Sequence, residues 1–429
     1  MSQTQEKQIL KKVFDKVDEL WNEEVSFLSK LGKYQSTLGN EAPIQHYIAD
    51  FLKNEIDMDL DVFVPDLEKI SNHKGFSTPE WSYEGRPNVV GKLATDGPKI
   101  GKSLILQGHI DVVSPEPVEL WNYDPWGSVI EGNRMYGRGI QDMKSGVAAM
   151  IFALKAIKDS GIRLGSDVLI ETVIEEECTG NGALATLVEG YKADGALIPE
   201  PFGQTALDAQ VGVLWMRVKV KGLGAHTERA DQAVNAIEKA MILINSIQEY
   251  QAYINQLEKH DKYKNHLHPL NVNIGTINSG DWPSSVPSEC TFEVRVGFYP
   301  GVDPQKVKEE IKAWILKRAM QDEWLKEVNP EITFYGFHAE GVSLNRDLEI
   351  FKTLERAHKL VTGQELEYVA ITCTTDVKYY NLYYDIPCTC YGPKGGNMHG
   401  ANEWVDLNSV KEVTKAYAAF IIDWCKTRN

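Results

Sequence analysis

The sequence has few cysteines, and their spacing excludes two common uses of this residue. The six cysteines form no Cys-x-x-Cys pair and no framework of the kind that staples a small secreted domain. A thiolate-rich structural zinc site therefore has no basis in this chain. We expect reduced thiols in a reducing compartment, the cytoplasm.

Long apolar runs and an excess of positive charge are also absent. No run of about eighteen apolar residues is present, and the N-terminal stretch MSQTQEKQILKK lacks the apolar core of a signal peptide. The formal net charge is -16, which would repel nucleic acid or an anionic membrane at long range. We therefore expect neither partner, although an acidic surface also serves solubility alone.

What is present fits a globular protein with two domains. Hydrophobic residues make up 43% of the chain and charged residues 25%, as in ordinary globular proteins. A length of 429 residues exceeds what one core usually serves.

The stretch SLILQGHIDVV, residues 103–113, is the one around which the chain is organised. Its continuous apolar run predicts a strand covered on both faces, and parallel sheets carry their chemistry at the carboxyl ends of such strands. His109 would lie at that edge, and Asp111 is placed to hold its other imidazole nitrogen. His-x-Asp alone is a weak signal, and a histidine satisfied in a turn is the alternative.

Other polar residues follow strands or glycine-rich turns further along the chain. Asp142 lies in the turn GRGIQDMKSG, where capping a helix is the simpler interpretation. The predicted strand 167–174 ends in three adjacent glutamates, which need a positive partner unless they are solvated. The remaining ones are Glu200, after the predicted strand 195–198, and His399, in a glycine-rich loop. Two imidazoles and several carboxylates at one sheet edge suit two divalent ions, zinc or in its place cobalt or manganese.

The middle of the chain has a different pattern. Between residues 211 and 336 it predicts strand, helix, strand, strand, helix and strand, the order of a ferredoxin-like domain. We therefore predict an α/β protein in which a mostly parallel-sheet catalytic domain, residues 1–209 and 338–429, carries an inserted α+β lid, residues 210–337.

These motifs together resemble the dinuclear zinc hydrolases that include acetylornithine deacetylase, succinyl-diaminopimelate desuccinylase, carboxypeptidase G and aminoacylase. The resemblance covers nearly the whole chain and rests on GHIDVV, GRGIQDMKSG, the glutamate run with TGNGA, IPEP, GAHTERADQAVNAI and YGPKGGNMHGANEWV. It implies that the metal ligands are His109, Asp142 as the bridge, Glu177, Glu200 and His399. It also implies a cis peptide bond between Asp142 and Met143. Asp111 would orient His109, and counting back from Gly182 makes Glu176 the general base, although the register within Glu175, Glu176 and Glu177 is open.

The resemblance further assigns roles to two residues of the inserted segment. His226 corresponds to a histidine that reaches the active site of a second subunit and stabilises the oxyanion, so a homodimer through the lid is implied. Arg295 is similar to an arginine that binds a substrate carboxylate. The family often has Asn-x-x-Pro where this chain has Ser284 to Pro287, and Gly-Gly-Thr-Asp where it has Cys373 to Asp376, which leaves the substrate open.

The function implied is metal-dependent hydrolysis of the amide bond in a small N-acylated amine or amino acid, most similar to the acetylornithine deacetylase branch. Glu176 would take a proton from water and return it to the leaving amine. The enzymatic alternatives are an N-formyl-aminopyrimidine deformylase of thiamin salvage and a carboxypeptidase or dipeptidase. The alternative from another class is a dimeric binding module without catalysis.

Overall fold

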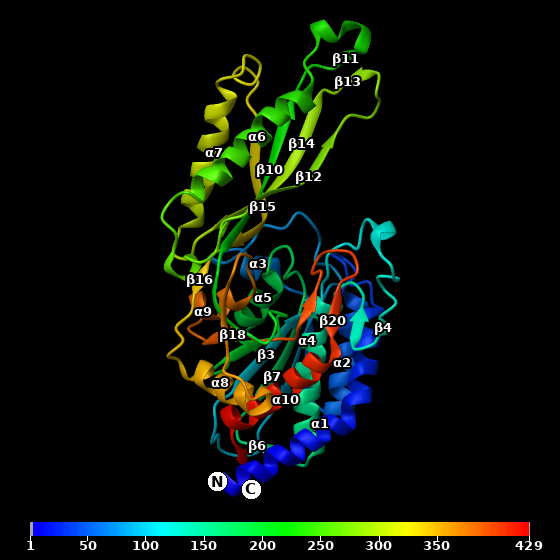
Figure 1. The fold of residues 1–429 in the computed structure, drawn as a ribbon, viewed down its shortest axis with the longest axis vertical. Helices are drawn as coiled ribbons and strands as arrows, with labels where there is room; N and C mark the ends of the chain where they lie inside the picture. The colour runs from blue at the N-terminus through cyan, green and yellow to red at the C-terminus, as the bar shows by residue number, and fades with distance from the viewer. Residues whose placement is uncertain (1–2, 429) are drawn as a thin grey trace.

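The computed structural model describes residues 3–428 and shows two parts, each with its own hydrophobic core (Figure 1). The larger core draws on both ends of the chain, from Val13 to Cys425. The smaller core is built from residues between Ala209 and Ala339. The molecule is elongated: the smaller part stands at one end, and the beginning of the first helix and the last strand lie at the other. The domain boundaries at 209/210 and 337/338 stay a prediction, close to the limits of the smaller core.

A six-stranded sheet forms the centre of the larger part. The order of its strands is β1-β2-β7-β3-β8-β18, and the three pairings among β7, β3, β8 and β18 are parallel, whereas β1–β2 and β2–β7 are antiparallel. All residues of β3 and β7 are buried, as their apolar runs indicate. The strands are β1 Asp59–Phe63, β2 Asn88–Leu93, β3 Leu104–His109, β7 Val168–Val173, β8 Ala196–Ile198 and β18 Cys388–Cys390.

Long helices cover this sheet. Helix α4 lies against β3 and β7 and is packed on its other side by α1 and α10, so nearly all of its residues are buried. Helix α5 contacts β2 and β7 and packs with α3 and α9. The helices are α1 Gln3–Gly32, α2 Ala42–Ile56, α3 Leu67–Ile70, α4 Ser145–Asp159, α5 Asn181–Glu189, α8 Glu349–Thr362, α9 Val377–Tyr383 and α10 Leu407–Cys425. Within residues 3–428, no helix is both long enough and apolar enough to cross a membrane.

The smaller part is a four-stranded antiparallel sheet with two helices, and we call it the lid. Its strand order is β12-β14-β10-β15, the ferredoxin-like arrangement expected from the sequence. Its elements are β10 Gly212–Lys221, α6 Ala236–Ile254, β12 Val272–Ser279, β14 Glu289–Phe298, α7 Pro304–Ala319 and β15 Glu331–Ala339. Helix α6 begins at Ala236, because the Asn235 side chain accepts the N–H groups of Ile237 and Glu238 and caps the helix there.

Several short strands pair segments that are distant in sequence, and periodicity did not reveal them. One sheet combines β9 Ala206–Gln210, β16 Val342–Ser343 and β17 Tyr368–Ile371; another combines β4 Val129–Glu131, β5 Arg134–Tyr136, β19 Gly395–Gly396 and β20 Trp404–Asp406. The two-stranded pairs are β6 Arg163–Leu164 with β21 Thr427–Arg428, and β11 Ala225–His226 with β13 Ser285–Val286. Strands β19 and β20 flank the loop that carries His399, so this sheet ties that loop to the turn region before α4.

Candidate metal centre

His109 is the last residue of β3 and is almost completely buried, with 1% of its surface exposed. Its Nδ1 hydrogen-bonds the backbone oxygen of Asp111 at 2.9 Å. This bond directs Nε2 toward two carboxylates: Asp142 Oδ1 lies at 3.2 Å and Glu200 Oε1 at 3.8 Å. The strand end therefore presents one imidazole nitrogen to a group of acids.

Asp111 acts differently from the expectation that its side chain holds the imidazole. Its carboxylate is 3.7 Å from His109 Nδ1, and it instead accepts the backbone N–H groups of Glu176 at 3.2 Å and Glu177 at 3.1 Å. The backbone carbonyl, not the carboxylate, makes the close contact with the imidazole. Asp111 thus connects the turn after β3 with the glutamate run after β7.

Asp142 lies in the turn Ile140–Lys144, just before α4 begins at Ser145, and its φ of -110° and ψ of 95° are not helical. The turn is entered through Gly139, whose φ of 75° suits glycine, and the peptide bond from Asp142 to Met143 is cis, as the resemblance implied. Asp142 Oδ1 faces His109, and Asp142 Oδ2 lies 3.4 Å from His399 Nε2. One carboxylate therefore presents one oxygen to each imidazole.

The first member of the glutamate run points away from this group. Glu175 has a left-handed φ of 68° and is fully buried. Its carboxylate accepts hydrogen bonds from Arg86 at 2.5 Å and Trp81 at 2.6 Å, and from Tyr83. Arg86 also pairs with the buried Glu41. Arg86 is thus the positive partner that the glutamate run required, and the sequence offered no signal for it because it lies 89 positions away.

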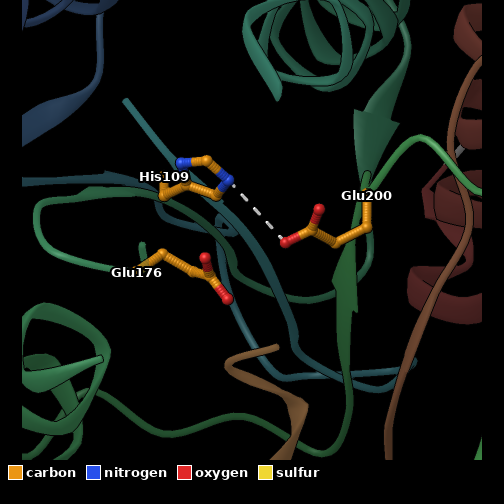
Figure 2. Close-up of side chains that lie close together, drawn as sticks. All are labelled: His109, Glu176 and Glu200. Carbon is orange, nitrogen blue, oxygen red and sulfur yellow. Dashed lines mark ion pairs between the residues drawn. The ribbon is translucent and has the colours of Figure 1, made fainter. Parts of the chain in front are cut away.

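Glu176 and Glu177 both face the acids and imidazoles. Glu177 Oε1 lies 3.0 Å from His399 Nε2. Figure 2 shows the carboxylates of Glu176 and Glu200 directed into the same space beside the His109 ring. Possible ligand atoms of His109, Glu176 and Glu200 lie within 4.8 Å of one another, and so do those of His109, Asp142 and Glu177.

Burial and crowded charge perturb the pKa values of these groups. Burial, with further contributions from neighbouring carboxylates, holds the pKa values of Glu176 and Glu200 well above their ordinary range. The Glu177 carboxylate, with help from Asp142, raises the pKa of His399 to about 11 despite partial desolvation. These raised pKa values mean that the crowded side chains bind protons tightly when no other positive charge is near. A metal cation would compete with the protons for the same nitrogen and oxygen atoms.

These residues fit two divalent cations. Glu176 Oε1 is buried and has no hydrogen-bond partner among the described residues, and such an oxygen is costly unless a cation or a bound molecule contacts it. One set, His109 with Glu200, and a second set, His399 with Glu177, share Asp142. Imidazole nitrogens and carboxylate oxygens are ligands that zinc accepts.

A pocket of about 660 Å³ lies beside this cluster. It is lined by Glu176, Glu177 and His399 from the larger part and by lid residues that include Arg295 and Trp215. The guanidinium of Arg295 donates to the backbone oxygens of Thr372 at 2.8 Å and Asn271 at 3.4 Å, and burial lowers its pKa.

His226 is the predicted site residue that the structure does not bring to the cluster. It lies exposed in β11 at the far tip of the lid (Figure 1), where its Nδ1 accepts the backbone N–H of Glu228 at 3.1 Å. Within one chain it has no access to the metal centre in this conformation, and its role in a second subunit stays a prediction. Sequence reasoning also missed Arg138 and Glu403, a buried ion pair beside Asp142.

Residues 105–423, most of the chain, match the family model described as Peptidase family M20/M25/M40. The chain belongs to this family. The resemblance stated from its motifs is thereby confirmed, and the chain is an M20 family hydrolase whose structure contains a candidate metal site.

Curated relatives extend over most of this M20 chain. An N-formyl-4-amino-5-aminomethyl-2-methylpyrimidine deformylase from Bacillus subtilis (strain 168) is 29% identical over 384 residues, which cover 83% of this chain and 88% of the relative. A protein of the same name from Halalkalibacterium halodurans is 26% identical over 374 residues, covering 82% and 87%.

Solved structures of low sequence identity share the M20 fold. The di-peptidase Dug1p from Saccharomyces cerevisiae superposes with a TM-score of 0.80 at 16% identity, covering 98% of this chain and 99% of the other. Human carnosine dipeptidase 1 gives 0.76 at 17% identity, covering 97% and 100%. The expected α/β fold is confirmed.

Proposed function

We propose that this protein hydrolyses the amide bond of a small N-acylated amine, with an N-formylated aminomethylpyrimidine as the leading substrate. The observation that carries the proposal is the pair of imidazole and carboxylate sets that share Asp142, with an unpartnered oxygen of Glu176 beside them. The deformylase names of the curated relatives favour the formyl group.

In this proposal some of the nine predicted site residues hold the cations, and the others take part in the reaction, border the substrate or hold the backbone of the site. His109, Asp142 and Glu200 hold one cation, and Asp142, Glu177 and His399 hold the other; both are zinc in our proposal, with cobalt or manganese as substitutes. When bound, the cations supply Lewis acidity for the acyl oxygen and lower the pKa of water at the site.

Glu176 is the proposed proton carrier. Its carboxylate points into the same space as that of Glu200, beside the His109 ring (Figure 2), whereas the Glu175 carboxylate is hydrogen-bonded to Arg86 and Trp81. Glu176 takes the proton of the attacking water and delivers it to the departing amine. Asp111 holds the backbone of Glu176 and Glu177, which fixes both carboxylates in position.

The lining of the pocket supports a flat amine as the leaving part of the substrate. Trp215 and Phe337 meet edge to face with their ring centroids 5.2 Å apart, and the neutral amides Gln251 and Asn273 lie in the same lining. Aromatic faces stack on planar rings, and amides pair with ring nitrogens and amino groups. Arg295 already donates to two backbone carbonyls, so we propose that it borders the substrate and that a substrate carboxylate is not required.

We also propose a cytoplasmic homodimer formed through the lid. In this proposal His226 acts on the site of a second subunit, since it lies in β11 at the lid tip (Figure 1). Strand β12 is an edge strand, with Ile277 and the nearby Trp282 exposed by 51% and 68%, a surface that a second copy can cover. The six cysteines are all free, which favours a reducing compartment.

The test is amine release by the zinc- or cobalt-loaded protein from N-formyl, N-acetyl and N-succinyl amines and from dipeptides. We expect the formylated aminomethylpyrimidine to give the highest kcat/KM. A dipeptide as best substrate would favour the peptidase alternative, and no turnover by a protein with two bound ions would favour a binding module.

Two neighbouring variants separate the roles of the glutamates. Glu176→Gln is expected to lower kcat by about 10³-fold, in the range of general acid–base catalysis, while both ions remain bound. Glu177→Gln is expected to lose an ion. Metal content measured by mass spectrometry distinguishes them, and loss of an ion from Glu176→Gln would overturn the assignment of Glu176 as the base.

A further inference from the structure

The carboxylate of Glu403 lies at the centre of a buried set of donors beside the metal cluster. Its Oε1 accepts the backbone N–H groups of Gln141 at 2.9 Å and Asp142 at 3.1 Å. Its Oε2 accepts the N–H of Gly139 at 3.0 Å and is paired with the guanidinium of Arg138. Glu403 and Arg138 are 1% and 2% exposed. One side chain therefore satisfies three backbone donors of the turn that presents Asp142.

The same ion pair fixes the loop that presents His399. Glu403 follows His399 by four positions, and its backbone oxygen accepts the N–H of Gly137 at 3.0 Å. Arg138 donates to the backbone oxygen of Gly400 at 3.2 Å. Both the main chain and the side chain of Glu403 thus connect the His399 loop to the Asp142 turn.

The His399 loop has a backbone conformation that needs such support. His399 has a φ of 60°, and Asn397 and Asn402 have φ values of 61° and 58°, in the left-handed region that L-residues occupy at a cost. His399 lies about half exposed on this loop. Its position relative to Asp142 must therefore be set by contacts elsewhere in the loop.

We propose that Glu403 is a positioning residue that locks the Asp142 turn and the His399 loop together and thereby sets the affinity of the cation position formed by Asp142, Glu177 and His399. The inference rests on the proposed metal centre. Asp111 supplies a parallel, since its carboxylate likewise holds the backbone of a turn that carries candidate ligands. Each of these outer carboxylates binds backbone N–H groups and leaves the cations to the inner residues.

The chemistry of Glu403→Gln makes this testable. The substitution keeps the size of the side chain but replaces one acceptor oxygen by an NH₂ group. That NH₂ group would face either Arg138 or a backbone N–H, donor against donor, and the buried guanidinium would lose its counter-ion. The two loops should then separate or shift while the sheet beneath them stays folded.

The experiment titrates zinc and cobalt into the metal-free full-length protein against a competing chelator, with the visible absorption of bound cobalt as a second signal. Glu403→Gln is expected to lower the affinity for one of the two ions by about 10- to 100-fold, as the loss of a residue that holds a metal ligand in place typically does. It is also expected to alter the cobalt absorption bands. The other ion also uses Asp142 but not the His399 loop, so its binding should be weakened less.

Glu24→Gln is the matched control. Glu24 is an acidic side chain with 1% exposure that accepts the hydroxyl of Thr414 at 2.6 Å between α1 and α10, outside both loops. It should retain the wild-type affinities and the wild-type cobalt spectrum. Wild-type affinities in Glu403→Gln, or losses no larger than those of Glu24→Gln, would overturn the inference.

Arg138→Lys keeps the inference testable if Glu403→Gln does not fold. Lysine retains the charge but loses the forked guanidinium that joins Glu403 to Gly400. The affinity for the same ion is therefore expected to fall several-fold, and unchanged affinity would contradict the positioning role of Glu403. A wild-type protein that binds neither ion would overturn the proposed metal centre itself. Two tightly bound ions in every variant would overturn only the role of Glu403.

Discussion

The two parts of the molecule contribute to the site in different ways. In the larger part, every predicted residue lies at a strand end or in an adjoining turn, and one chain brings them together. In the lid, Arg295 at the base of the sheet lines the pocket, whereas His226 lies at the tip, away from the metal centre. Folding of the larger part is therefore enough to bring its proposed site residues together. The contribution of the lid depends instead on its position relative to the pocket or to a second subunit.

The largest effect that tests this difference is expected from the lid tip. We predict that His226→Ala lowers kcat by about 10²- to 10³-fold, the usual cost of losing one oxyanion donor, while both ions remain bound. Steady-state kinetics and metal analysis on the same preparation measure the two quantities. A parallel loss of metal would mean that the lid and the metal centre are not separate contributors.

Mixing variants sharpens the same comparison. His226→Ala and Glu176→Gln subunits, each nearly inactive alone, should regain activity when subunits exchange, because a mixed dimer has one site with an intact base and an intact His226 from the partner. No recovery on mixing, with exchange demonstrated, would show that His226 does not act across subunits.

A smaller effect, on stability, is expected inside the larger part. Burial raises the pKa of Glu171 from 4.5 to about 7, although Thr186 and Tyr380 donate hydrogen bonds to it. The folded state then binds more protons than the unfolded state between these values, so stability falls as pH rises from about 4.5 to 7 and is level above that.

Glu171→Gln should remove this contribution to the pH dependence. From acid to neutral pH, the free energy of unfolding of the variant should rise by on the order of 3 kcal/mol relative to that of the wild type, since one pKa unit corresponds to about 1.4 kcal/mol. Urea unfolding of the metal-free proteins at pH 5 and pH 8 measures it. A difference between variant and wild type that is equal at both pH values would contradict the prediction.

The smallest effect is expected where the two parts meet. Arg217 on β10 makes two hydrogen bonds to Glu80 of the larger part, at 2.9 and 2.8 Å, and both side chains are partly exposed. Glu80→Gln should reduce the free energy of unfolding by less than about 1 kcal/mol, and less at high salt. The pair Lys221 and Glu331 lies within the lid, so Lys221→Gln is the control. Urea unfolding at low and high salt measures both variants, and an equal loss of stability in the two would show that the contact between the parts has no special effect.

The sequence predicted the regular elements well where their pattern was local. The order strand, helix, strand, strand, helix and strand predicted between residues 211 and 336 is that of β10, α6, β12, β14, α7 and β15, and the fully buried β3 follows from its apolar run. Short strands such as β9 and β20 were missed because two to five residues carry too little periodicity and their partners are distant in the chain.

The candidate site was predicted in its members but not in its supporting contacts. The position of Glu175 depends on Arg86 and Glu41, and the hydrogen bonds of Asp111 depend on a turn after a different strand. Neither contact has a local signal, since each joins segments that approach only after the sheet has formed.

The sequence by itself determined which residue types stand at the ends of buried strands, because apolar runs and glycine turns specify strands and their termini locally. It also determined the family, through motifs spread along the chain. Only the tertiary structure decided that Asp142 faces two imidazoles, that Glu175 turns away from them and that Glu403 joins two loops. Those outcomes depend on distances between segments far apart in the chain, which are fixed by the packing of the whole sheet and not by any one stretch of residues.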